Sequence, residues 1–262
     1  MSLSRGVSAK TAKGGRTYQV GTDGEERFLP SVTTILRVID KPFLLPWSIR
    51  LEREYLLNIA GIIYQDSLRA PKPFSRAEFL RQIEANFPKG NASDVVGRDA
   101  AALGTAAHKK CEWFLKGMLG AGGVARGPEP EVRWESEWAF QTFKAWVEKT
   151  GFLPTLVEQT VYSLKYGYAG TMDILGILDG ETVLIDIKTS GKIYRDSFRQ
   201  NVAYQEGVNE MGLSRVTRGL TIRLPKTKSE TEVEVAWVPD REVIWQEFLA
   251  ALTLWKGEHA TP

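Results

Sequence analysis

Two aspartates and a lysine whose spacing could support metal chemistry flank a predicted β-hairpin. Asp179-Gly180 lies between two segments rich in Ile, Leu and Val, which is the strongest short-range indication of a two-residue type I′ turn. A turn at this position fixes the register of the two strands, and Asp173 then falls directly opposite Asp186. Lys188 is two residues beyond Asp186 and therefore shares its face of the sheet.

The carboxylates of Asp173 and Asp186 are expected to be close neighbours, because the Cβ atoms of directly opposed residues are about 4.5–5.5 Å apart. Like charges at this distance repel by about 3–4 kcal/mol at an effective dielectric constant near 20. Protonation of one carboxylate, screening by Lys188, or a hard divalent cation between the two would relieve this repulsion. A structural Asp-Lys-Asp network on a solvated sheet face is the alternative that involves no ligand.

The composition is that of an ordinary globular protein, built as one domain or as one domain with a large insertion. The chain has 262 residues, of which 43% are hydrophobic and 25% charged, and no collagen-like, coiled-coil or disordered class fits these values. The formal net charge is only +2, so any affinity for nucleic acid must come from local clusters of Lys and Arg. One such cluster is N-terminal, where Arg5, Lys10, Lys13 and Arg16 could contact phosphates or could simply be solvated.

The sequence also argues against several kinds of site. Cys111 is the only cysteine, which excludes an internal disulfide framework, a cysteine-rich zinc site and an iron–sulfur cluster held by four thiolates of this chain. Gly191-Lys192 is followed by Ile193 and forms no Walker A motif, so a built-in motor is not expected. Without a long apolar segment or a signal peptide, we expect a soluble, cytoplasmic protein with no membrane partner.

A helical region with interleaved basic and aromatic residues occupies positions 42–86. Among these residues, Trp47, Arg50 and Arg53 could form a groove in which single-stranded bases stack and phosphates are paired. The alternative is that the aromatic residues belong to the core and the arginines are solvated. We expect residues 1–92 to form an N-terminal arm, a hairpin that turns near Asp23-Gly24 and this helical region. Together they would cover a site built by residues 93–262, within one compact unit.

The remaining elements must position the candidate residues around the hairpin. Before the hairpin come a helix capped by Ser93-Asp94 and ending at Gly117, a helix over 131–150, and a strand over 153–164. The buried side of the second helix is predicted to carry Trp134, Trp138, Phe143 and Trp146. After the hairpin come a helix over 196–211, strands over 216–224 and 231–238, and a last helix capped by Asp240. His108 lies beside the apolar stripe of the first helix, as a structural residue or as a ligand. Glu158 lies on the first strand, while Gln200 and Tyr204 are one turn apart on the helix after the hairpin.

Four of these short patterns, taken in order, resemble a known nuclease branch. The patterns are His108, Gly170-x-x-Asp173, Asp186-Ile187-Lys188-Thr189 and Gln200-x-x-x-Tyr204. They resemble the RecB-type branch of the PD-(D/E)XK nuclease superfamily, which implies an α/β fold with an αβββαβ core, a mixed sheet flanked by helices and, in this chain, an N-terminal helical insertion. A looser similarity covers residues 29–36 with Trp47 downstream, which look like the N-terminal region of phage and bacterial single-strand exonucleases related to the mitochondrial genome-maintenance exonuclease.

The resemblance implies a metal centre. His108, Asp173, Asp186 and the backbone carbonyl of Ile187 would be ligands, and Glu158 could add a further oxygen. Such ligands suit Mg²⁺ or Mn²⁺.

In the same way the resemblance implies catalytic roles and a substrate. Lys188 would orient the attacking water, and Gln200 and Tyr204 would position Lys188 or the DNA backbone. The implied activity is that of a metal-dependent DNA exonuclease that prefers single-stranded ends and serves repair, recombination or replication, with a phage genome as one conceivable source. A helicase, a recombinase or a single-strand-binding protein is left open as a partner.

Other functions remain open at this point. A ring-forming duplex exonuclease and a dimeric or structure-specific endonuclease would use the same residues. A non-catalytic nucleic-acid-binding module is an alternative of another class, although such a module has no need of two opposed carboxylates. A metal-dependent enzyme that acts on another substrate also fits, since a fold does not dictate its function.

Overall fold

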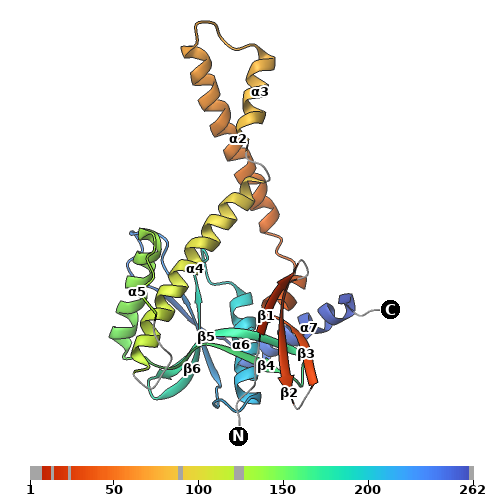
Figure 1. Cartoon of the computed structure of the whole chain (residues 1–262), viewed down its shortest axis with the longest axis vertical. Coiled ribbons are helices and arrows are strands. Elements are labelled where there is room, and N and C mark those ends of the chain that lie inside the picture. Colours follow the sequence, from red (N-terminus) through yellow and green to blue (C-terminus); the bar gives the residue numbers. More distant parts are fainter. Residues whose placement is uncertain (1–7, 13–14, 23–24, 88–90, 121–126, 260–262) are drawn as a thin grey trace. The chain divides into compact units, whose positions relative to one another are not determined.

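The computed structural model describes residues 8–12, 15–22, 25–87, 91–120 and 127–259 (Figure 1). The chain divides into two compact units, of which the larger comprises Met1–Ile39 and Leu103–Pro262 and the smaller comprises Asp40–Ala102. This division differs from the expected one at 92/93. The N-terminal strands belong with the large sheet because β2 and β3 contact β5, a non-local contact that no sequence pattern reveals.

A five-stranded mixed sheet organises the larger unit. Its strands, in the order in which they lie side by side, are β4 (Leu153–Ser163), β5 (Tyr168–Leu178), β6 (Glu181–Lys188), β7 (Arg218–Arg223) and β8 (Glu234–Trp237). Neighbouring strands are antiparallel except for β6 and β7, which are parallel and are joined through α6 (Arg195–Glu210). The predicted succession of two helices, three strands, a helix and a strand is therefore confirmed.

The central hairpin has the predicted turn and register. Asp179 and Gly180 have φ values of 51° and 80°, as a type I′ turn requires. Leu178 pairs with Glu181, and the ladder continues with the same register as far as Ile174 and Ile185.

Helices pack against the sheet and form two hydrophobic clusters with it. One cluster joins Leu184 of β6 to α6 and α7 (Arg241–His259), with Val202 and Phe248 among its buried residues. The other joins Ile185 and Ile187 to α4 (Ala92–Met118) and α5 (Trp134–Thr150). Since successive residues of β6 enter different clusters, the strand is buried on both sides.

Two helix starts differ from the prediction. α4 begins at Ala92, so that Ser93 and Asp94 lie in its first turn and do not cap it; the Asn91 carbonyl accepts the Asp94 N–H instead. α5 begins only at Trp134, which is 54% exposed and therefore does not belong to the buried side of the helix. Phe143 is buried as predicted, together with Ala139, Phe140 and Val147, while Trp138 and Trp146 are half-buried. Periodicity in this aromatic-rich helix allows more than one stripe, so it did not decide the place of Trp134.

A three-stranded sheet and a short helix complete the larger unit. The sheet consists of β1 (Ser8–Ala12), β2 (Gly15–Thr22) and β3 (Glu25–Pro30), and it is followed by α1 (Val32–Ile35) and the 3₁₀ helix η1 (Leu36–Val38). β2 and β3 pair as the predicted hairpin, with Thr22 opposite Glu25; the expected turn at Asp23-Gly24 lies outside the described residues. The side chain of Ser31 caps α1 by accepting the Thr34 N–H.

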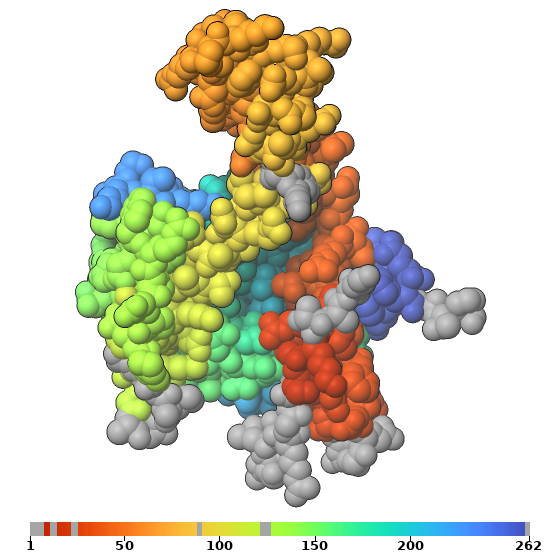
Figure 2. Space-filling model, turned by 45° about the horizontal axis from the view of Figure 1, so that its top comes forward, coloured from red at the N-terminus to blue at the C-terminus, as the bar shows by residue number. Residues whose placement is uncertain are grey.

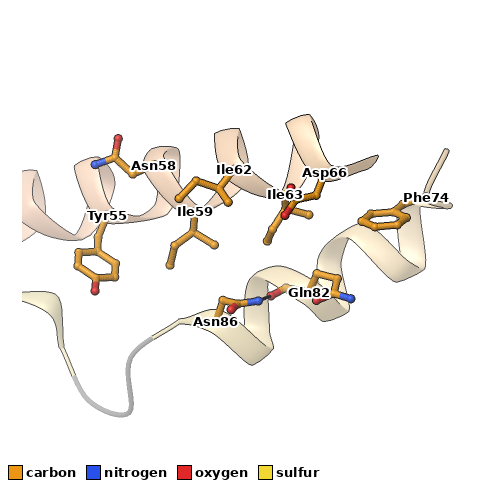
Figure 3. A pocket seen from close by; sticks show the side chains of 9 residues that line it. All are labelled: Tyr55, Asn58, Ile59, Ile62, Ile63, Asp66, Phe74, Gln82 and Asn86. Atoms are coloured by element: carbon orange, nitrogen blue, oxygen red, sulfur yellow. Dashed lines mark hydrogen bonds between the residues drawn. The ribbon is translucent and has the colours of Figure 1, made fainter. Parts of the chain in front are cut away.

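The smaller unit is a helical hairpin of α2 (Leu44–Arg69) and α3 (Arg76–Asn86), followed by the first residues of α4. A cleft of about 440 Å³ lies between α2 and α3, into which Ile59 and Ile63 point from α2 (Figure 3). Across the described ranges, no helix combines the length and apolar character that crossing a membrane would need.

Candidate metal centre

Three side chains from three elements converge on one point of the larger unit. His108 of α4, Glu158 of β4 and Asp173 of β5 each offer a ligand atom within 4.8 Å of the other two. The His108 Nδ1 and Asp173 Oδ2 atoms are 3.8 Å apart. All three residues are half-buried, so a bound ion would be partly shielded from water.

Carboxylates form a row across three neighbouring strands. The pairs Val157–Ile174 and Gln159–Met172 place Glu158 opposite Asp173, and the hairpin register places Asp173 opposite Asp186. Glu158 has a φ value of 53°, a left-handed conformation that is unfavourable for a residue with a side chain. The structure thus holds a strained residue at the point where the acidic groups gather, as is common at functional sites.

The β5–β6 ladder ends where this row begins. The Ile187 N–H donates to Asp173 Oδ2 over 2.7 Å, so that a side-chain carboxylate takes the place of a strand carbonyl. The N–H and C=O groups of one residue point to the same side of a strand, so the Ile187 carbonyl also faces Asp173 and not β7. The role of that carbonyl as a ligand stays a prediction.

Asp186 has a buried carboxylate with an unsatisfied oxygen. The residue is 1% exposed, and its Oδ1 accepts a hydrogen bond from Lys188 Nζ over 2.7 Å. Its Oδ2 is buried without a partner, which is costly unless a ligand satisfies it. A divalent cation beside Asp173 is a ligand of the required charge.

The electrostatics of the row favour a positive ligand. Burial raises the pKa of Glu158 to about 8, and the charges of Asp173 and Glu112 add to the effect. Burial likewise raises the pKa of Asp186 to about 7, against the attraction of Lys188 and with the repulsion of Asp173. Two acids that hold protons this strongly would release them to a metal ion.

Lys188 remains a cation and is held in place by a polar chain. Burial lowers its pKa, but the carboxylates of Asp186 and Asp173 outweigh this and raise it. Lys188 Nζ also donates to Gln200 Oε1 over 3.1 Å, and Gln200 Nε2 donates to the Tyr204 hydroxyl over 3.1 Å. Gln200 therefore contacts the lysine directly, and Tyr204 contacts it only through Gln200.

Gly104 and Gly170 allow α4 and α6 to approach this site. A Cβ atom on Gly170 would lie 2.4 Å from Cε1 of Tyr204, and a Cβ on Gly104 would lie 2.5 Å from Oγ1 of Thr189. Gly170 thus makes room for the ring at the end of the polar chain. Gly104 is one turn before His108 on α4 and brings this turn of the helix against the end of β6. In the sequence, only its spacing of four residues from His108 indicated that Gly104 lies near the site.

The residues proposed from the N-terminal helical region are not part of this cluster. Trp47, Arg50 and Arg53 lie on α2 in the smaller unit. Trp47 is half-buried, and the two arginines are exposed.

Comparisons with known proteins give only distant similarities. No protein-family model matches the chain, and no curated protein does. Among solved structures, an alkaline exonuclease (LHK-Exo) from Laribacter hongkongensis aligns at 11% identity with a TM-score of 0.36, over 58% of this chain and 85% of its own. The same exonuclease in complex with dAMP aligns at 12% identity with a TM-score of 0.34, over 58% and 90% of the two chains. Similarity at this level does not assign the chain to a family.

Proposed function

We propose that the chain is a metal-dependent DNA exonuclease of the PD-(D/E)XK type, which hydrolyses phosphodiester bonds and prefers single-stranded ends. The observation that carries the proposal is the carboxylate row of Glu158, Asp173 and Asp186, with an unpartnered buried oxygen on Asp186. His108 lies beside Glu158 and Asp173 as a further proposed ligand. Lys188 donates a hydrogen bond to Asp186 at the end of the row. Buried carboxylate oxygens without a hydrogen-bond partner are uncommon, which favours a ligand at Asp186.

The donor set fits a hard divalent cation. Carboxylate and carbonyl oxygens are the preferred ligands of Mg²⁺ and Mn²⁺, and one imidazole is compatible with Mn²⁺. Asp173, Asp186, His108, the Ile187 carbonyl and Glu158 would hold the ion. When bound, such an ion lowers the pKa of a coordinated water and offsets charge on the scissile phosphate.

Lys188 is proposed to orient the attacking water and to stabilise the negative charge that develops on the phosphate. Its ammonium group is suited to this role because hydrogen bonds to Asp186 and Gln200 fix two of its three donor directions. The third donor direction is available to substrate. Gln200 and Tyr204 are positioning residues that keep the ammonium group beside the carboxylates.

Single-stranded DNA is proposed as the substrate, with a role in repair, recombination or replication. Exposed Arg50 and Arg53, with Trp47 on the same helix, offer charge and an aromatic surface for phosphates and bases.

The test is digestion of end-labelled single-stranded, duplex and circular DNA with Mg²⁺, Mn²⁺ or EDTA. We expect metal-dependent loss of linear single strands by the wild type and none by Asp186→Asn. Asp179→Asn is the matched control, since it removes an exposed carboxylate from the turn of the same hairpin and Asn-Gly also suits a type I′ turn. Cutting of circles would indicate an endonuclease, and binding without cutting would contradict an enzymatic function.

A further inference from the structure

The segment Ser31–Thr34, which the metal centre does not use, holds the backbone of Arg16. The Arg16 N–H donates to Thr34 Oγ1 over 3.0 Å, and the Ser31 N–H donates to the Arg16 carbonyl over 2.9 Å. The hydroxyl oxygens of Ser31 and Thr34 are 2.8 Å apart and buried. Both backbone groups of Arg16 are thus fixed by α1 and its cap, so the position at which its side chain leaves β2 is defined.

An aromatic ring supports the Arg16 side chain beside the candidate metal centre. The guanidinium carbon lies 4.9 Å from the ring centre of Tyr18, a distance typical of a cation–π contact. Tyr18 is 2% exposed, and its hydroxyl is 2.9 Å from Thr171 Oγ1 on β5. Thr171 is two residues before Asp173 and shares its face of the strand.

The charge of Arg16 is not neutralised by an acid. Arg16 lies on β2, which contacts β5, the strand that carries Asp173. Among the described residues, no carboxylate forms an ion pair with Arg16, whereas Lys116 of α4 is paired with Glu112. β1 and β2 lie at the surface of the larger unit (Figure 2), and Arg16 itself is exposed.

We propose that Arg16 binds a backbone phosphate of the nucleic-acid strand whose scissile phosphate lies at the metal centre. The inference rests on the proposed function and adds to it a phosphate-binding residue on β2. A guanidinium group offers two parallel donors to a phosphate, and the ring of Tyr18 and the fixed backbone keep it in one orientation. An exposed arginine over a ring, beside an acidic row and without an acid of its own, is the cation that the chain offers to an incoming phosphate.

The test is binding of a fluorescein-labelled oligothymidylate by the full chain, followed by fluorescence anisotropy at several salt concentrations. The measurement is made in EDTA and again with Ca²⁺, and the wild type is compared with Arg16→Gln and Arg16→Lys. The matched control is Arg218→Gln, because Arg218 also stacks on a ring, that of Trp237 at 4.0 Å, but is paired with Glu181 beside the turn of the central hairpin. Thermal denaturation of each variant shows that the fold is retained.

We expect Arg16→Gln to bind about tenfold more weakly and the slope of log affinity against log salt to decrease by about 0.7, the value for one phosphate contact to a single strand. Arg16→Lys should keep the slope and lose part of the affinity, and Arg218→Gln should behave as the wild type. An unchanged affinity and slope for Arg16→Gln would overturn the inference, as would a wild type that binds in neither buffer. Cleavage with Mg²⁺ is scored separately: a wild type that binds through Arg16 without cleaving would overturn only the proposed function, and a wild type that cleaves without needing Arg16 would overturn only this inference.

Discussion

Asp186 is expected to make the stability of the metal-free protein depend on pH. Burial raises its pKa from 3.8 to about 7, with Lys188 opposing the rise and Asp173 adding to it. Between these values the folded chain keeps a proton that the unfolded chain releases, so the free energy of unfolding falls as the pH rises. Since one pKa unit corresponds to about 1.4 kcal/mol, Asp186 alone should lower the free energy of unfolding by about 4 kcal/mol once the pH exceeds about 7.

The variant Asp186→Asn isolates this effect. Asparagine keeps the shape of the side chain but cannot ionise, so the metal-free variant should lose the fall in stability that Asp186 causes between about pH 4 and pH 7. The loss of the charge that faces Lys188 lowers the stability of the variant as a whole, so the slope against pH, and not the absolute stability, is compared. Below about pH 3 the aspartate is protonated in both states and no longer contributes to the slope. Urea denaturation in EDTA at several pH values measures the difference, with Asp179→Asn as the control that should keep the wild-type profile.

Divalent cations complete the comparison. The proposed site binds a cation through ionised carboxylates, so Mg²⁺ or Mn²⁺ should stabilise the wild type most at alkaline pH. Asp186→Asn should gain much less from the ions because one ligand charge is missing. The reasoning would be refuted by a wild-type stability in EDTA that stays level or rises between about pH 5 and pH 8, or by a metal-free Asp186→Asn whose stability falls as steeply with pH as that of the wild type.

Two further substitutions test the surroundings of the carboxylate row. Gly170→Ala introduces a Cβ at 2.4 Å from the buried Tyr204 ring, so we expect a loss of about 1–3 kcal/mol in stability and a lower kcat with little change in KM, measured by denaturation and by steady-state cleavage. Lys188→Met leaves the buried Asp186 charge without its partner, so the metal-free protein should lose about 3–5 kcal/mol of unfolding free energy at alkaline pH. Cleavage should disappear, while Mg²⁺ should still stabilise the variant. A variant that cleaves at the wild-type rate would contradict the role given to the lysine.

The register that opposes Asp173 to Asp186 could be predicted because it depends on local chemistry. A two-residue turn at Asp179-Gly180 determines every pair of the hairpin, and the observed ladder follows that register. Gly151, which ends the helix over 134–150, could be predicted for the same reason, and it adopts a φ value of 64°.

The proximity of His108 to Asp173 could not be derived from spacing. It depends on how closely α4 packs against β6, which Gly104 and Thr189 determine through a contact between residues far apart in sequence. The proximity of Arg16 to the carboxylate row could not be predicted either, because it arises from the packing of a separate sheet on β5. Trp134 was misplaced because periodicity in an aromatic-rich helix does not decide which stripe is buried.

The topology of the sheet explains why the candidate centre forms at this point of β6. β6 is paired with β7 from Val183 to Lys188 but with β5 only up to Ile185. The last residues of the strand therefore have a strand neighbour on one side alone, and their backbone groups on the other side need partners from elsewhere. Asp173 supplies one partner by accepting the Ile187 N–H.

The neighbouring Asp186 has a buried carboxylate oxygen without a hydrogen-bond partner. Asp173 and Glu158 cannot satisfy this oxygen, since an ionised carboxylate donates no hydrogen bond. A cation would satisfy all three carboxylates at once. The end of the β5–β6 ladder, and not a dedicated loop, is thus what creates the proposed metal site, and restoring a donor there by Asp186→Asn is the change that should weaken metal binding strongly while leaving the sheet intact.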